Sequence, residues 1–460
     1  MHETKSLPEK SKHMIKIVVP ILITQVALYL MTFFDILMTS KYSIDHLAGV
    51  SIGSSIWVPV YTGLTGILIG ITPIVAQLIG AKKKEDVRTF VQQGFYIAII
   101  LALIVFFGIL LLIDPVLNLI PLEDSVRLVA KKYLYMMSIG LIPLFLYSVL
   151  RSLIDALGRT KVSMVITLLS APINIALNYI FIYGKFGFPA LGGVGAGLGS
   201  AVTYWLILII AIVIVYKNKP FAELAVFNFW SKPSFAKIGN LTKIGVPIGL
   251  SIFAETTIFS AVTILMSVYS TEVISAHQIA MNFTSLLYMV PLSIAMGATI
   301  LVGHEVGAKR YKDARTYSWL SVGTAVFFSF ISASILLVFR EPIASIYTND
   351  THVITLTVQF FFFAALFQLS DAIQAPVQGA LRGYKDVTIT FIMAIISYWI
   401  IGLPTGYILA TYTSFERFGY WIGLIVGLTL GAITLGIRLV YIQKKWKKID
   451  EKNNRISTIK

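Results

Sequence analysis

The sequence predicts an all-α polytopic membrane protein with twelve transmembrane helices in two six-helix lobes, related by a pseudo-two-fold axis along the membrane normal. The 460-residue chain is 57% hydrophobic and only 13% charged, and its mean hydropathy is +0.82. A soluble protein carries about twice that share of charge. Apolar runs long enough to cross a bilayer recur along the chain, and an internal repeat divides them into two equal sets.

Each of the twelve apolar runs is about 20 residues or longer, which is the length of a membrane-spanning helix. The expected spans are residues 14–39, 48–77, 90–113, 130–154, 160–183, 194–216, 241–268, 275–303, 316–338, 354–379, 387–411 and 418–443.

Basic residues set the orientation of these spans. The side that holds both termini carries 30 of the 37 Lys and Arg residues. The positive-inside rule therefore predicts that both termini are cytoplasmic. The other side holds Lys41, Arg127, Lys131, Lys132, Lys185, Arg340 and Arg417.

The chain repeats itself at a constant offset. The segment "KIVVPI" at Lys16 recurs as "KIGVPI" at Lys243, and "IVAQLIGAKKKEDVRTF" at Ile74 aligns with "LVGHEVGAKRYKDARTY" at Leu301, both 227 residues later. Further on, "ALGRTK" at residue 156 aligns with "ALRGYK" at residue 380, so we expect three residues to be lost between these blocks. Each copy contains six spans, an even number, so both copies enter the membrane in the same orientation.

These repeats predict the domain organisation. We expect an N-terminal lobe at residues 1–216, a cytoplasmic linker at 217–240, a C-terminal lobe at 241–443 and a basic cytoplasmic tail at 444–460. Two such lobes would enclose a cleft that opens to either side of the membrane, which is the architecture of a transporter. The formal charge of +15 comes from residues that punctuate apolar runs, so we expect lipid headgroups and not nucleic acid as the partner.

Three acidic residues are expected well inside the spans: Asp35, Glu255 and Asp371. Placing an unpaired, ionised carboxylate at this depth in the membrane costs about 3 kcal/mol or more. No Lys or Arg is expected at comparable depth, since Arg151 and Arg438 lie near cytoplasmic ends. The three acids are therefore expected to hold a proton, hold a small cation, or face water and receive a cationic substrate. The alternative is a satisfied acid in the protein core.

Other polar residues are candidates to complete these sites. Asn174 and Asn178 are four residues apart and so share one helical face. Their amides either ligate Na+ or share a protonated Asp35, or they only join neighbouring helices. Thr203 in the sixth span is a weaker candidate. His277 is expected near the outer end of the eighth span, where it either titrates near neutral pH or is incidental.

Two further features of the sequence are the prolines inside the spans and the lack of cysteine. Pro20 and Pro247 are repeat equivalents, so we expect a bend early in the first helix of each lobe, with Pro20 as a candidate hinge. The absence of cysteine excludes disulfides, thiolate metal sites and cysteine nucleophiles. No metal-ligand pattern, nucleophile–base pair or phosphate-binding loop is found, so we expect neither an enzyme nor a cofactor.

The chain resembles the multidrug and toxic compound extrusion (MATE) family over about residues 14–443. The residues that carry the resemblance are the two six-span halves, Asp35 in the first span, the Gly-Ala-Lys blocks after the second and eighth spans, and "PINIALNYIFIYG" in the fifth. Glu255 in the seventh span and Asp371 in the tenth resemble the bacterial NorM branch.

The resemblance implies export of lipophilic organic cations, coupled to Na+ or alternatively H+, by alternating access. It implies that Glu255, Asp371 and Tyr288 bind the cation in the C-terminal lobe, with Na+ at the two acids, and that Gln278 lines the substrate path. Asp35, Asn174, Asn178 and Thr203 match a cation, proton or substrate site in the N-terminal lobe. Some family members carry an acid where Asn178 stands and a Tyr where Phe367 stands. We further expect a multi-pass monomer in a bacterial cytoplasmic membrane.

Two other functions compete with this interpretation. A lipid-linked precursor flippase of the same superfamily would be expected to line its path with Arg or Lys, whereas the deep charges here are acidic. A membrane-embedded enzyme, the less favoured alternative, would turn over lipid without any ion gradient.

Overall fold

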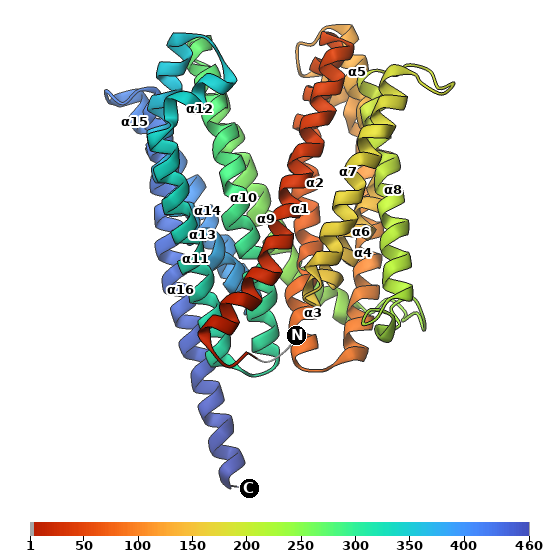
Figure 1. Ribbon diagram of the computed structural model, residues 1–460, viewed down its shortest axis with the longest axis vertical. Coiled ribbons are helices and arrows are strands. Elements are labelled where there is room, and N and C mark those ends of the chain that lie inside the picture. Colours follow the sequence, from red (N-terminus) through yellow and green to blue (C-terminus); the bar gives the residue numbers. More distant parts are fainter. Residues whose placement is uncertain (1–3, 460) are drawn as a thin grey trace. The chain divides into compact units, whose positions relative to one another are not determined.

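The computed structural model describes residues 4–459, and the described chain is built from helices, as expected. Figure 1 shows the helices as long, roughly parallel rods within each part of the chain. The helices are α1 (Leu7–Tyr42), α2 (Ile44–Ile69), α3 (Ile71–Gly80), α4 (Lys84–Asn118), α5 (Asp124–Ile139), α6 (Leu141–Ala156), α7 (Thr160–Tyr183), α8 (Gly193–Lys217), the 3₁₀ turn η1 (Ala222–Leu224), α9 (Phe235–Met266), α10 (Thr271–Gly307), α11 (Tyr311–Val338), α12 (Arg340–Tyr347), α13 (Thr351–Gly383), α14 (Thr388–Ile395), the π-helical η2 (Ile396–Gly402), α15 (Leu403–Tyr412) and α16 (Arg417–Ile459).

Eleven of the spans in the described residues are long and apolar enough to cross a membrane alone, and a bent pair brings the number to twelve. The pair is α5 and α6, whose axes differ by 48°. Pro143 explains the bend, because its ring excludes a helical bond to the carbonyl of Ile139, four residues earlier. That carbonyl accepts a hydrogen bond from Trp205 Nε1 at 3.3 Å instead. The span expected at 130–154 is therefore present as this bent pair.

Two helices that carry candidate site residues have capped N-termini. The Oγ atom of Ser270 accepts from the backbone N–H of Val273 at the start of α10, and Asp350 Oδ1 accepts from His352 and Val353 at the start of α13. Such caps satisfy backbone donors that a helix leaves unpaired at its N-terminus. The first residues of these two long helices are thereby fixed before the helices enter the apolar region.

The chain divides into two compact units. Unit 1 comprises Ile23–Leu78 and Lys83–Gly249, and unit 2 comprises the described residues up to Leu22, Ile79–Lys82 and the chain from Leu250 onward. The first part of α1 thus packs in unit 2, and the first part of α9 packs in unit 1. Both divisions follow a proline by two residues, after Pro20 and Pro247. The boundaries of the two lobes and of the linker that we expect from the sequence remain a prediction.

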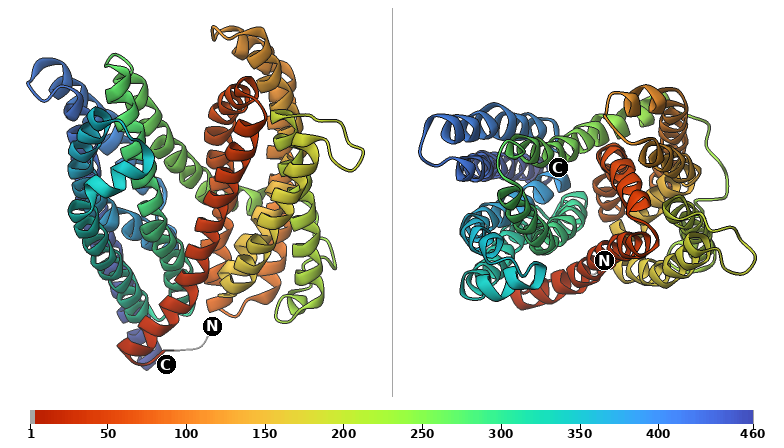
Figure 2. Two further views of the ribbon diagram at one scale, coloured as in Figure 1. Left: turned by 45° about the horizontal axis from the view of Figure 1, so that its top comes forward. Right: turned by 90° about the horizontal axis from the view of Figure 1, so that it is seen from above.

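Within unit 1, α7 and α8 run side by side in both views of Figure 2. Within unit 2, α13 packs against α10, α11 and α16, which places it at the centre of that unit. The last turns of α16 extend beyond the other helices of unit 2 in Figure 1. Polar side chains of α13 are therefore surrounded by three other helices of the same unit.

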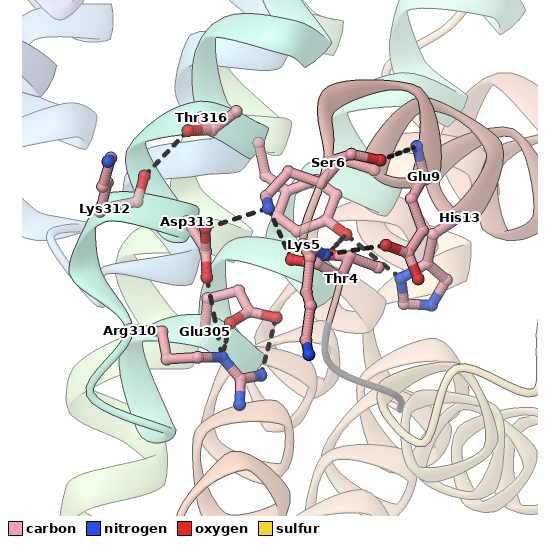
Figure 3. Close-up of polar contacts among 12 residues, drawn as sticks. Thr4, Lys5, Ser6, Glu9, His13, Glu305, Arg310, Lys312, Asp313 and Thr316 are labelled. Carbon is pink, nitrogen blue, oxygen red and sulfur yellow. Dashed lines mark hydrogen bonds and ion pairs between the residues drawn. The ribbon is translucent and has the colours of Figure 1, made fainter.

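The N-terminal turns of α1 are fixed to unit 2 by a buried polar cluster (Figure 3). Lys10 Nζ lies 3.1 Å from Asp313 Oδ1 and donates to the Thr4 carbonyl at 2.7 Å. The Tyr317 hydroxyl bonds Thr4 Oγ1 at 2.9 Å and His13 Nδ1 at 3.2 Å. The side chain of Lys10 is only 6% exposed, so its charge depends on these partners.

The segment between α8 and α9 is fixed to α4 within unit 1. Gln92 donates from Nε2 to the Val226 carbonyl at 2.8 Å, and its Oε1 accepts from Ser231 N–H at 3.0 Å. The neighbouring Gln93 accepts from Ser234 N–H through Oε1 at 2.8 Å. Both glutamine side chains are fully buried. The segment expected as a cytoplasmic linker is therefore packed on unit 1 along much of its length.

The backbone shows the repeat in its turns. Lys82 and Lys309, 227 residues apart, both have φ of 60°. Gly158 (φ 72°) and Lys385 (φ 61°) are also 227 apart, directly after the ends of α6 and α13. The constant offset therefore continues through this turn. The expected alignment of residue 156 with residue 380, at an offset of 224, is wrong. The two similar segments lie at different distances from the end of their helix, so they are not structurally equivalent.

Candidate functional site

Asp35 lies in the last third of α1, in the part that belongs to unit 1, and its carboxylate faces α7. Asn178 Nδ2 donates to Asp35 Oδ1 at 2.5 Å. The same amide nitrogen donates to Asn174 Oδ1 at 3.2 Å, and Asn174 Nδ2 donates to Ser200 Oγ at 3.4 Å. The three predicted residues Asp35, Asn174 and Asn178 therefore meet in one hydrogen-bonded chain. No ion pair to Asp35 is found among residues 4–459.

The side-chain amide of Asn178 has room between α7 and α8 because Gly199 of α8, which has no side chain, lies beside it. A Cβ on Gly199 would lie 2.2 Å from Asn178 Oδ1, well inside any allowed contact. The Asn178 side chain is fully buried, and its Oδ1 has no hydrogen-bond partner in the described structure. An unpaired buried carbonyl oxygen is costly, and it is also a ligand that small cations accept.

Thr203 makes no hydrogen bond with Asp35 in the described structure, whereas two tyrosines lie near this acid. Thr203 Oγ1 donates to the Gly199 carbonyl at 2.7 Å, so its proton is used on its own helix. Its role in a cation site stays a prediction. The hydroxyls of Tyr133 and Tyr204 lie near enough to interact electrostatically with Asp35, and sequence reasoning missed both.

In unit 2, Glu255 on α9 is joined to α13 by a glutamine. Gln378 Nε2 donates to Glu255 Oε1 at 2.8 Å, and Gln378 Oε1 accepts from Arg382 Nη2 at 3.2 Å. Arg382 is only 9% exposed and interacts electrostatically with Glu255. The expectation that no basic residue lies near the deep acids is therefore wrong for Glu255. The expected span ended at residue 379, whereas α13 continues to Gly383 and keeps Arg382 buried.

Asp371 and Tyr288 belong to the same cluster. Asp371 on α13 interacts electrostatically with Glu255, and Tyr288 on α10 interacts with both acids. Tyr398 in η2 also interacts with both acids, and its hydroxyl accepts a hydrogen bond from Gln374 Nε2. The structure thus brings the predicted residues Glu255, Asp371 and Tyr288 together. Neither Asp371 nor Asp35 takes part in an ion pair in the part of the chain that is described.

Three other predicted residues lie apart from these clusters. Gln278 is exposed near the start of α10, ten residues and about 15 Å of helix before Tyr288. Pro20 is buried inside α1, which continues as one helix through it. His277 is fully buried: Trp421 Nε1 donates to its Nδ1 at 3.1 Å and Thr263 Oγ1 lies 3.1 Å from its Nε2. The role of Gln278 and the hinge at Pro20 stay predictions.

The acids and tyrosines of unit 2 fit a monovalent cation better than a transition metal. Within residues 4–459, no group of three or more His, Cys, Asp and Glu side chains is arranged to hold a metal ion. The oxygens of Glu255, Asp371 and Tyr288 are hard donors of the kind that bind Na+ or a proton. Such an ion would be carried by the protein and would not be a resident cofactor.

Sequence reasoning missed the polar stripe of α13. Asp371, Gln374, Gln378 and Arg382 are spaced by three, four and four residues, which places them on one helical face. This periodicity was readable in the sequence. It was missed because the expected span ended at residue 379, before Arg382, and because Gln374 and Gln378 were not considered as site residues.

The chain also matches a family of known fold. The sequence profile of the MatE family matches residues 20–180 and 247–408, two blocks that begin 227 residues apart. The chain belongs to the MatE family. It is 55% identical over 446 residues to the "Probable multidrug resistance protein NorM" of Bacillus licheniformis, covering 97% of this chain and 99% of that relative. It is 53% identical over 448 residues to the protein of the same name from Bacillus subtilis, covering 97% and 99%.

Solved structures of MATE transporters share the fold. The crystal structure of the eukaryotic MATE transporter AtDTX14 superposes with a TM-score of 0.85 at 21% identity, covering 97% of this chain and 99% of that one. The crystal structure of MATE in complex with MaL6 superposes with a TM-score of 0.87 at 18% identity, covering 95% and 97%. The resemblance to the MATE family and the all-α fold in two six-helix lobes are confirmed.

Proposed function

We propose that this protein is a secondary active multidrug efflux antiporter. It exports lipophilic organic cations in exchange for Na+, with H+ as the alternative coupling ion. The observation that carries the proposal is the set of contacts made by the three acids Asp35, Glu255 and Asp371. The Asp35 carboxylate accepts from the Asn178 amide, and Asp371 and Glu255 share one cluster with two tyrosines. An ionised carboxylate at this depth needs a compensating positive charge, and a coupling cation or proton supplies it where no basic side chain does.

Exchange requires that the ion and the drug favour different conformations. A ligand shifts a conformational equilibrium only by its difference in affinity for the two states. The coupling ion binds the acids from outside and favours one state, and the drug favours the other. The membrane potential contributes about 2.3 kcal/mol per inward charge for each 100 mV.

The cargo follows from the charge of the sites and from the relatives. The relatives from Bacillus are named multidrug resistance proteins, and the family is one of transporters. Acidic groups attract cations, and the aromatic side chains, 13% of the chain, offer apolar and cation–π surface to flat organic cations. Gln278 is proposed to line the substrate path, and Pro20 to act as a hinge.

The proposal includes the place of the protein in the cell. It is a multi-pass membrane protein, and the charge asymmetry of its loops supports cytoplasmic termini in a bacterial cytoplasmic membrane. The basic residues of the tail favour contact with anionic lipid headgroups. We propose that the monomer is the transporting species.

A lipid-linked precursor flippase is the second candidate. Its anionic headgroup would need Arg or Lys in the path, and Arg382 is buried at the end of α13. Arg382 is, however, bonded to Gln378 and neutralises Glu255, so it is not free to bind a headgroup. Two experiments separate these functions. An exporter should expel ethidium and should not rescue a strain that lacks the flippase. A membrane-embedded enzyme, the third candidate, would convert added lipids to product without a gradient.

Ethidium efflux from proteoliposomes tests the proposed function. Gradients of Na+ and of H+ are imposed separately on vesicles that contain the purified full chain. Efflux that accelerates with one gradient and stops when it is collapsed supports antiport and identifies the ion. Efflux that ignores both gradients contradicts it.

A further inference from the structure

The polar stripe of α13 carries a charge of each sign. Asp371 and Arg382 lie at its two ends, and Gln374 and Gln378 lie between them. The side chains of Gln374, Gln378 and Arg382 are each at least nine-tenths buried. A buried arginine is stable only where its charge is compensated, so Arg382 is part of the electrostatics of the acids that the proposed function assigns to cation binding.

Gln378 bridges Arg382 and Glu255, and only one orientation of its side-chain amide allows both hydrogen bonds. A guanidinium can donate hydrogen bonds but cannot accept them, so the Gln378 oxygen must face Arg382. The Gln378 amide nitrogen then faces Glu255 and donates to it at 2.8 Å. This arrangement favours the ionised carboxylate of Glu255, which accepts, over the protonated form, which would have to turn its proton elsewhere.

The charges of this cluster leave one negative charge uncompensated. With both carboxylates ionised, Glu255 and Asp371 contribute two negative charges and Arg382 contributes one positive charge. Resting on the proposed function, we propose that Arg382, acting through Gln378, is a built-in countercharge that limits the Glu255–Asp371 site to a single monovalent cation. A divalent cation would leave an excess positive charge in a region of low dielectric constant.

Unit 1 compensates charge at the matching positions. At the offset of 227, Gln378 corresponds to Arg151 and Arg382 to Asp155. Arg151 Nε lies 3.5 Å from Asp155 Oδ2, and Ser163 Oγ donates to Asp155 Oδ1 at 2.6 Å. That pair is neutral in itself, whereas Asp35 has no basic partner in the described part of unit 1. The Asp35 site and the Glu255–Asp371–Arg382 cluster therefore each carry one net negative charge when their carboxylates are ionised, although the residues that achieve it differ.

A charge-rescue experiment tests the role of Arg382. Na+ binding to the purified full chain is measured by titration calorimetry in an Asp35→Asn background, so that the signal reports the acids of unit 2. Glu255→Gln leaves Asp371 and Arg382, a net charge of zero, and should weaken Na+ binding at least tenfold. Glu255→Gln combined with Arg382→Gln restores one negative charge and should recover a large part of that loss.

The matched control is Glu255→Gln combined with Arg438→Gln. Arg438 belongs to unit 2 but is paired with Asp386, 2.6 Å away, so its removal should recover nothing. A purely structural role for Arg382 predicts that the double variant binds worse than Glu255→Gln alone. That result, or equal recovery with Arg438→Gln, would overturn the inference.

Competition by Mg2+ gives an independent measurement. Arg382→Gln alone leaves two negative charges, so Mg2+ should displace Na+ at least tenfold more effectively than in the Asp35→Asn parent. Arg382→Lys keeps the charge and should restore discrimination against Mg2+. Unchanged competition in Arg382→Gln contradicts the inference. Gradient-driven efflux of ethidium by the wild-type chain tests the proposed function separately, so failure of the charge rescue with intact efflux overturns the inference alone.

Discussion

Asn178 donates from Nδ2 to Oδ1 of Asp35 at 2.5 Å, and this bond joins the first acid of the chain to helix α7. A hydrogen bond to a charged group contributes about 1.5–3 kcal/mol. The amide compensates part of the cost of burying Asp35 but supplies no full charge. The site is therefore held ready for a cation without being neutralised in advance.

Replacement of Asn178 by Ala should impair coupling without unfolding the protein. Asp35 loses its donor, and the loss of about 1.5–3 kcal/mol corresponds to roughly a tenfold to hundredfold weaker site. Ethidium efflux from proteoliposomes is expected to fall by that order at limiting gradient. Asn178→Gln, which keeps the amide, should fall less than Asn178→Ala. Equal efflux for wild type and Asn178→Ala would show that the bond is not needed.

Replacement of Gly199 by Ala should have a similar effect from a different helix. The added Cβ would lie 2.2 Å from Asn178 Oδ1, so the amide must move away from Asp35. Gly108→Ala on α4 is the matched control, because no atom lies within 4 Å of a Cβ there. We expect efflux to fall in Gly199→Ala and to stay unchanged in Gly108→Ala. Equal activity of the two variants would contradict the packing shown here.

Replacement of Lys10 by Met should destabilise the protein. Lys10 is the buried partner of Asp313, and removal of one member of a buried ion pair costs about 3–5 kcal/mol. The melting temperature in detergent should therefore drop by several degrees. Lys12→Met is the control, since Lys12 is exposed on the same helix. A melting temperature equal to that of wild type in Lys10→Met would mean that the contacts in Figure 3 do not stabilise the fold.

Lys385 should make stability depend on pH in the alkaline range. Burial lowers the pKa of Lys385, which lies in the turn after α13, from 10.5 to about 8. Between pH 8 and 10.5 the unfolded chain binds this proton and the folded chain does not, so stability rises with pH across that window. The gain is at most about 3 kcal/mol.

Melting temperatures at pH 8 and pH 10 measure this effect. The difference should be smaller in Lys385→Met than in wild type, because Met cannot take up the proton. Met has the same Cβ as Lys, so the strain at φ 61° is unchanged. The same pH dependence in both proteins would exclude Lys385 as its source.

Much of the fold was predictable because membrane burial leaves strong patterns. Runs of apolar residues locate the spans, and the repeated blocks at Lys16 and Lys243 locate the two halves. A proline inside a span, such as Pro143, can kink its helix, but the bond from Trp205 on a distant helix to the Ile139 carbonyl could not be predicted from the sequence. The assignment of the first turns of α1 to unit 2 depends on Lys10 and Asp313, which are far apart in sequence.

The candidate sites were predicted only in part. Asp35 and Asn178 were placed together because helical spacing and an unusual carboxylate pointed to them. The roles of Gln378 and Arg382 were not predicted, because an arginine at a span end is ordinarily interfacial and only the packing of α13 shows it to be buried. The register of a repeat also cannot be read from similar letters alone, as the turns at Gly158 and Lys385 show.

The central claim is that the buried carboxylates bind the cation that drives export, and Asp371→Asn tests it most directly. Ethidium efflux from proteoliposomes with equal amounts of folded protein is compared between wild type and this variant under the gradient that drives the wild type. We predict at least a tenfold loss of gradient-driven efflux with an unchanged melting temperature. Efflux at the wild-type rate would contradict the account.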